Sequence, residues 1–143
     1  MEKISSFKIN HNIHDVGFYL SSVNKDIFTY DLRFKKPNDG DYISPAAAHT
    51  VEHLFATVIR NCEIRDNVIY FGPMGCRTGF YLLLRNIPLA EAKRRVISVI
   101  KACIELNEIP GGAKIECGNY RSHNLIAAKT ELSAYLAALS KQK

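Results

Sequence analysis

Long apolar runs are missing from this sequence of 143 residues. No stretch approaches the roughly 20 apolar residues that a helix needs to cross a bilayer. The opening segment, MEKISSFKIN, also lacks the apolar stretch of a secretory signal. We therefore expect a cytoplasmic protein that has no membrane partner.

A concentrated basic surface is also missing, although the net charge is +5. The lysines and arginines are scattered in short groups, and no basic stripe alternates with aromatic residues as in many nucleic-acid-binding proteins. This pattern argues against a nucleic-acid partner. It favours a solvated basic surface that attracts small anionic molecules.

The four cysteines contain no CxxC pair. In a chain without an export signal, a disulfide framework is the weaker interpretation of such cysteines. At least some of them are therefore candidates for metal binding or catalysis.

Internal repeats, low-complexity segments and linkers are absent as well, so we expect a single catalytic domain over residues 1–143. In IFTYDLRF, apolar and polar residues alternate with the period of a half-buried strand. Ser44 followed by Pro45 is typical of a helix start. Strands are predicted at 5–10, 27–34, 67–71, 79–85 and 113–117, and helices at 45–61, after Pro88 and at 123–139. Because regular crossover helices are lacking, we predict an α+β fold with an antiparallel sheet packed against helices.

The stretch HTVEHLFA lies in the first predicted helix. Helical spacing puts His49, Glu52 and His53 on one side and an apolar stripe on the other. The two imidazoles, one turn apart, can bind a single ion, and Glu52 beside them is well placed for proton transfer. The pattern HxxEH is that of inverted zinc hydrolases, although a solvated polar face is the simpler alternative.

A third metal ligand must come from elsewhere, and cysteine is the obvious candidate. Cys62 and Cys103 lie on apolar helix faces, where a thiol usually acts as a small hydrophobe. Cys76 and Cys117 instead lie beside glycines, which leave room near the sulfur. A metal site needs at most one of this second pair if the other is a reactive group.

Five blocks of the sequence, in order along nearly the whole chain, resemble the S-ribosylhomocysteine lyase (LuxS) family. They are SFKINH, YDLRFKKPN, HTVEHLFA, GPMGCRTGFYL and CGNYRSHNL. The resemblance implies the LuxS-type metalloenzyme fold. It also implies cleavage of S-ribosylhomocysteine to homocysteine and 4,5-dihydroxy-2,3-pentanedione, the precursor of autoinducer-2, through carbonyl migration and β-elimination.

The resemblance further implies a role for individual residues. Metal ligands would be His49, His53 and Cys117, and the acid/base pair would be Cys76 and Glu52. Substrate contacts would come from Ser6, His11 and Arg33. The resemblance implies one divalent ion per chain, with Fe²⁺ favoured and Zn²⁺ or Co²⁺ able to occupy the site. It also implies a homodimer with active sites at the subunit interface.

One segment departs from the family pattern. Where the family commonly has Asp-Ile-Ser, this chain has Tyr70-Phe71-Gly72. The acidic residue expected to meet the amino group of the substrate is therefore replaced by Tyr70, and Asp31 or the carbonyl of Phe71 could compensate for it. His123, in the last block, is left without an assigned role.

Two rival hypotheses remain at this stage. The first is an HxxEH metal-dependent hydrolase or peptidase, in which Glu52 activates water and a downstream glutamate is the third ligand. It leaves Cys76 without a task. The second is a non-catalytic metal-binding relative, for which we would expect the Cys76 and Glu52 pair to be lost.

Overall fold

The computed structural model describes residues 1–142, which form a four-stranded antiparallel sheet in the order β1-β2-β4-β3 together with helices. The elements, in chain order, are η1 (Ser5–Lys8), β1 (Gly17–Asn24), β2 (Ile27–Arg33), α1 (Pro45–Ile59), η2 (Arg65–Asn67), β3 (Val68–Pro73), β4 (Gly79–Arg85), α2 (Leu89–Glu105) and α3 (Leu125–Lys141). The α+β prediction is confirmed. No helix in the described part of the chain is long and apolar enough to span a membrane.

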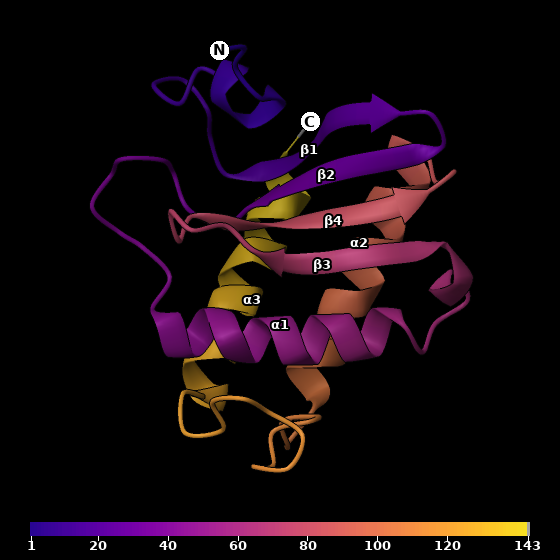
Figure 1. Cartoon of the computed structure of the whole chain (residues 1–143). Coiled ribbons are helices and arrows are strands. Elements are labelled where there is room, and N and C mark those ends of the chain that lie inside the picture. The colour runs from indigo at the N-terminus through magenta and orange to yellow at the C-terminus, as the bar shows by residue number, and fades with distance from the viewer. Residues whose placement is uncertain (143) are drawn as a thin grey trace.

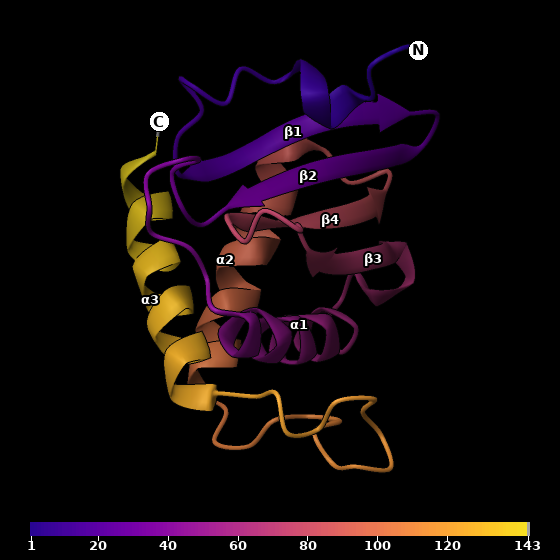
Figure 2. The ribbon, with the colours of Figure 1, turned by 60° about the vertical axis from the view of Figure 1, so that its left-hand side comes forward.

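The α-helices cover one face of the sheet, as Figures 1 and 2 show from two directions. The alternation in β2 explains this arrangement, because Tyr30 and Leu32 are fully buried on the helix side. Phe80, Leu82 and Leu84 of β4 bury their side chains in the same core. The residues between them along each strand point to the opposite face, which no α-helix covers.

Helix α1 begins as the sequence predicts. Ser44 is its N-cap and accepts a hydrogen bond from the Ala47 amide, and Pro45 occupies the first turn. The apolar stripe is buried against the core, where Phe55 stacks on Phe71 of β3 with 4.1 Å between ring centroids. The histidine-bearing side of α1 is therefore turned away from the sheet.

Helices α2 and α3 pack beside α1 and against each other. In α2 one apolar stripe, from Ala92 to Cys103, is buried, whereas Leu89, in the first turn, is exposed. Helix α3 begins after Asn124, whose side chain accepts from the Ala127 amide. The Tyr135 hydroxyl donates to the Gly17 carbonyl at 2.8 Å and so fixes α3 to β1.

Two predicted strands are wrong, and one strand was missed. Residues 5–10 contain the 3₁₀ helix η1, and residues 113–117 form turns, with the Cys117 amide donating to the Ala113 carbonyl. Neither segment pairs with a strand of the described sheet, and an extended segment without a partner leaves its backbone groups unpaired. β1 was missed because its residues lack clear alternation and its pairing with β2 shifts between Leu20 and Ser22.

Two irregular segments lie on different sides of this framework. The N-terminal segment, which contains η1, crosses near β1 and β2 (Figures 1 and 2). Residues 106–124 form a loop on the side of α1 that faces away from the sheet, as both views show. Each segment carries residues that the sequence singled out.

Candidate functional site

The loop of residues 106–124 brings two side chains to the histidines of α1. His49, His53, Cys117 and His123 place one potential ligand atom each within 4.8 Å of one another. The Cys117 Sγ lies 3.5 Å from His49 Nε2, 3.9 Å from His53 Nε2 and 3.6 Å from His123 Nε2. A tetrahedral zinc site has sulfur-to-nitrogen edges of about 3.6 Å. We call these four residues the donor cluster.

The second ring nitrogens of His49 and His53 are held by backbone carbonyls. His49 Nδ1 donates to Ser122 O at 2.7 Å, and His53 Nδ1 donates to Pro110 O at 2.8 Å. A carbonyl oxygen only accepts, so both Nδ1 atoms carry the hydrogen and both Nε2 lone pairs face the cluster. A donor set of two imidazole nitrogens and a cysteine sulfur fits a borderline divalent ion such as Fe²⁺, Zn²⁺ or Co²⁺.

The turn that supplies the Pro110 carbonyl depends on glycine. Gly111 has a φ of +64°, and a Cβ built there would lie 3.5 Å from His53 Nδ1. The turn at Pro110-Gly111-Gly112 thus positions an acceptor for the Nδ1 hydrogen of His53.

His123 is the member of the cluster to which sequence reasoning assigned no role. Its ring stacks on that of His49 with 3.9 Å between centroids, and its Nδ1 lies 2.9 Å from the Thr50 hydroxyl. Burial, followed by the proximity of His49 and His53, lowers the pKa of His123. Its ring is therefore neutral at pH 7. The sequence feature that could have identified His123 is its position in the same loop as Cys117, just before the N-cap of the closing helix.

The other two cysteines pack as the sequence suggested. Cys103 is fully buried in the core, and burial raises the pKa of its thiol to about 12. The half-buried Cys62 donates a hydrogen bond from its Sγ to the Ile59 carbonyl at 3.0 Å. Neither thiol belongs to the donor cluster.

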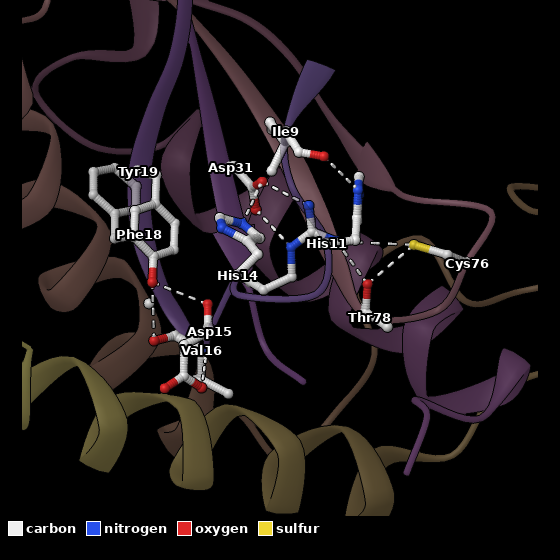
Figure 3. A network of polar contacts seen from close by, with 12 residues as sticks. Ile9, His11, His14, Asp15, Val16, Phe18, Tyr19, Asp31, Cys76 and Thr78 are labelled. Carbon is white, nitrogen blue, oxygen red and sulfur yellow. Dashed lines mark hydrogen bonds and ion pairs between the residues drawn. The ribbon is translucent and has the colours of Figure 1, made fainter. Parts of the chain in front are cut away.

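A second group of polar residues lies on the sheet face without α-helices. Arg33 and Asp31 point to this face and are nonetheless only 1% and 0% exposed. The guanidinium forms two hydrogen bonds with the carboxylate, at 3.1 Å and 2.7 Å. His14, from the N-terminal segment, approaches the same carboxylate at 3.2 Å (Figure 3). The positive charge of Arg33 is thus already paired within the chain.

Cys76 lies beside this pair, in the turn between β3 and β4. Its exposed thiol is 3.0 Å from the Thr78 hydroxyl and 4.0 Å from Arg33 Nη1 (Figure 3). Arg33 also donates to Thr78 at 2.8 Å. Arg77, the neighbouring cation in the sequence, instead lies over the ring of Tyr42. The cation close to the Cys76 sulfur is therefore Arg33, a residue 43 positions away in the sequence.

The N-terminal segment brings the remaining predicted residues to the same face. His11 has its Nδ1 2.9 Å from the Ile9 carbonyl and remains half-buried. Ser6 lines a cavity of about 430 Å³ together with Tyr70 and Tyr81. The Tyr70 ring lies directly over Gly72, so that a Cβ at residue 72 would collide with the Tyr70 hydroxyl. The two departures from the family pattern are therefore linked sterically.

The predicted site residues fall into two groups within one chain. Ser6, His11, Arg33 and Cys76 form what we call the sheet group (Figure 3 shows His11 and Cys76), whereas His49, His53 and Cys117 belong to the donor cluster, which α1 and the loop of residues 106–124 supply. Glu52, half-buried, lies next to His53 in the sequence of α1. One chain thus brings the metal-type ligands together and holds Cys76 with the sheet group.

Comparison with known proteins shows the family to which this chain belongs. The family model described as S-ribosylhomocysteinase (LuxS) matches residues 4–143. A protein of Borreliella afzelii named S-ribosylhomocysteine lyase is 43% identical over 152 residues, covering 100% of this chain and 96% of the relative. Relatives of the same name from Desulfotalea psychrophila and Finegoldia magna are 42% and 41% identical, covering 94% and 100% of this chain and 89% and 95% of their own lengths. With a match of this extent, the chain belongs to the LuxS family.

Proposed function

We propose that this protein is an S-ribosylhomocysteine lyase, which releases homocysteine and the autoinducer-2 precursor 4,5-dihydroxy-2,3-pentanedione. The observation that carries this proposal is the donor cluster of two imidazoles and a thiol in a chain that matches the LuxS family from residue 4 to residue 143. The hydrolase hypothesis is not favoured, because the cluster contains a cysteine in place of the expected downstream glutamate. Two product molecules account for every atom of the substrate, so no co-reactant is consumed.

The residues that would hold the ion are His49, His53 and Cys117, with Fe²⁺ as the favoured metal. Their lone pairs and sulfur converge from α1 and the loop of residues 106–124. When bound, a divalent ion supplies Lewis acidity, which stabilises negative charge on the sugar oxygens as carbon-bound protons are removed. The backbone carbonyls of Ser122 and Pro110 hold the two imidazoles in the ligating tautomer.

Cys76 and Glu52 would carry the protons. The Cys76 sulfur, 4.0 Å from the Arg33 guanidinium and exposed, would take a proton from carbon. Glu52, on the same helix as the histidine pair, would collect and return protons at oxygen and assist departure of the homocysteine thiolate. Both groups are half-buried or exposed and therefore accessible to substrate.

Ser6, His11 and Arg33 would contact the substrate on the sheet face. The cavity beside Ser6 is lined by phenol rings and small hydroxyls, and it contains Tyr70 where the family commonly has an acid. Arg33 is already paired with Asp31, so a substrate carboxylate would share it with that residue. Recognition of the homocysteine end would therefore depend more on hydroxyl groups than on a free carboxylate of the protein.

A homodimer with active sites at the subunit interface would unite the two groups. The support for this proposal is the sheet face without α-helices, where the exposed side chains of Ile4 and Tyr70 border the cavity beside Ser6. A second copy seated on this face would bury these residues and bring a donor cluster from the partner towards Cys76. We expect a solution mass of twice the chain mass of 16.1 kDa, as measured by light scattering.

The direct test is to incubate the purified, anaerobically prepared protein with S-ribosylhomocysteine and, separately, with S-adenosylhomocysteine. Titration of released thiol should show turnover of the first compound alone. Thiol release from neither compound by metal-loaded protein would overturn the lyase proposal.

The dimer proposal has a separate test. Cys76→Ala and His53→Ala chains, each inactive, are mixed under conditions of subunit exchange. If each site combines both chains, the mixture should regain about a quarter of wild-type activity, since half of the dimers are mixed and each contains one intact site. If each site lies within one chain, no activity returns.

A further inference from the structure

The histidines of the donor cluster differ in what holds their second nitrogen. His49 and His53 face carbonyl oxygens, which can only accept a hydrogen bond. His123 faces the Thr50 hydroxyl at 2.9 Å, and a hydroxyl can donate as well as accept. Only His123 can therefore carry its hydrogen on Nε2, the atom that faces the cluster.

The surroundings of Thr50 decide the direction of that bond. Thr50 is 0% exposed, and its oxygen accepts from the Asn124 amide at 2.9 Å. Within the described residues, His123 Nδ1 is its other side-chain partner. If His123 were the donor, the Thr50 hydrogen would be buried without an acceptor, which costs about 1–3 kcal/mol. The Thr50 hydroxyl is therefore the donor, and Nε2 of His123 is protonated.

The ring planes show that His49 and His123 cannot both bind one ion. The planes of His49 and His123 are only 22° apart at a centroid distance of 3.9 Å, so their in-plane directions run side by side. Both rings are steeply inclined to that of His53, His49 by 80° and His123 by 82°, so either could share an ion with His53 but not both together. The tautomer that Thr50 imposes on His123 leaves His49 as the ligand. His123 Nε2, 3.6 Å from Cys117 Sγ, is at N–H···S distance.

We propose that His123 is not a metal ligand but donates an Nε2–H hydrogen bond to the Cys117 sulfur, with Thr50 fixing its tautomer. This inference rests on the proposed metal site and is independent of the substrate. A hydrogen bond to a ligating thiolate withdraws electron density from sulfur, so the bound ion is the stronger Lewis acid. His123 then acts through Cys117 and would raise the rate without touching the substrate.

The tautomer can be measured in the wild-type protein. In the Zn²⁺-loaded chain, two-bond ¹H–¹⁵N correlation spectra distinguish a protonated Nδ1 from a protonated Nε2. We expect the Nε2–H form for His123 and the Nδ1–H form for His49 and His53, which serve as internal references. An Nδ1–H form for His123 would overturn the proposal and indicate a fourth ligand.

Variants loaded with Co²⁺ give a second readout that does not depend on turnover. His123→Leu removes the donor, and we expect the sulfur-to-cobalt charge-transfer band to move to longer wavelength, with one Co²⁺ retained per chain. His123→Gln, which keeps an N–H group at similar reach, should restore much of the band position. Thr50→Val should shift the band in the same direction as His123→Leu, whereas Thr50→Ser should leave it near the wild-type position.

The activity and metal affinity of these variants distinguish a hydrogen-bond role of His123 from metal ligation. His123→Leu should lower kcat about tenfold, within the range of outer hydrogen bonds at metal sites. A loss of Co²⁺ affinity of more than about 100-fold in both His123 variants would show ligation and contradict the proposal. Absence of lyase turnover with the expected tautomer and band shift would overturn the proposed function and leave this inference standing.

Discussion

The donor cluster and the sheet group differ in how firmly the contacts within one chain hold their functional side chains. In the donor cluster, every ring is held by a hydrogen bond to its second nitrogen, and the ligand atoms already face one another. In the sheet group, Arg33 is neutralised by Asp31 and the Cys76 thiol is exposed. If the proposed function holds, the metal site is preorganised within one chain, whereas Cys76 would meet the metal ligands only when a second copy of the chain is present.

This difference has an energetic basis. Imidazoles fixed by backbone carbonyls lose little conformational entropy when an ion binds, because that entropy is already lost during folding. The buried Asp31–Arg33 pair mainly avoids an unpaired charge, since such pairs contribute little net stability. We therefore expect mutations in the two regions to separate metal binding from turnover.

The largest effect is expected for Cys117→Ala, which removes the only sulfur donor of the cluster. Metal affinity should fall more than about 100-fold, and activity should be lost with it. Metal content after dialysis, measured by elemental analysis, checks this. A variant that keeps about one ion per chain would require a different third ligand.

Cys76→Ala should separate the two regions most clearly. Homocysteine release should fall about 10³-fold, in the range of a lost acid/base group, while metal content stays at the wild-type level. Thiol titration and elemental analysis on the same sample provide the comparison. Unchanged turnover would remove Cys76 from the mechanism.

Asp31→Asn tests the buried pair in the sheet group. It leaves the buried Arg33 charge without its partner, so we expect the free energy of unfolding to fall by about 3–5 kcal/mol, with metal content unchanged. Asp26→Asn is the matched control, because Asp26 pairs with Arg85 at the surface and its loss should cost less than about 1 kcal/mol. If urea titrations gave the two variants equal losses in the free energy of unfolding, burial of the Asp31–Arg33 pair would be unimportant.

The smallest effect is expected for Gly111→Ala. Alanine at a φ of +64° should cost about 1–2 kcal/mol of stability and disturb the carbonyl that holds His53, weakening metal binding several-fold. Gly40→Ala is the control, since Gly40 has a φ of +82° with no atom within 4 Å of the added Cβ. It should lose similar stability and keep the wild-type metal affinity, as measured by competition with a chelator.

Local patterns predicted much of the framework. The Ser44 cap and the face of α1 follow from residues within a few positions, and the strand at residues 79–85 was predicted with its observed bounds. The His49–His53 pair and the choice of Cys117 over Cys62 and Cys103 also needed only helical spacing, glycine context and family resemblance. The prediction of a strand at residues 5–10 was wrong, because a strand requires a partner strand and no local pattern specifies one.

The sequence by itself determined the three α-helices, three of the four described strands and the residue types of the site, because helix caps, strand alternation and HxxEH spacing are short-range properties. Only the tertiary structure decided that Arg33 lies beside Cys76, that the N-terminal segment covers Asp31 on the sheet face without α-helices, and that His123 joins the donor cluster. These contacts join residues that are distant along the chain or lie in irregular loops. Their geometry depends on how the whole chain packs, and no local periodicity encodes it.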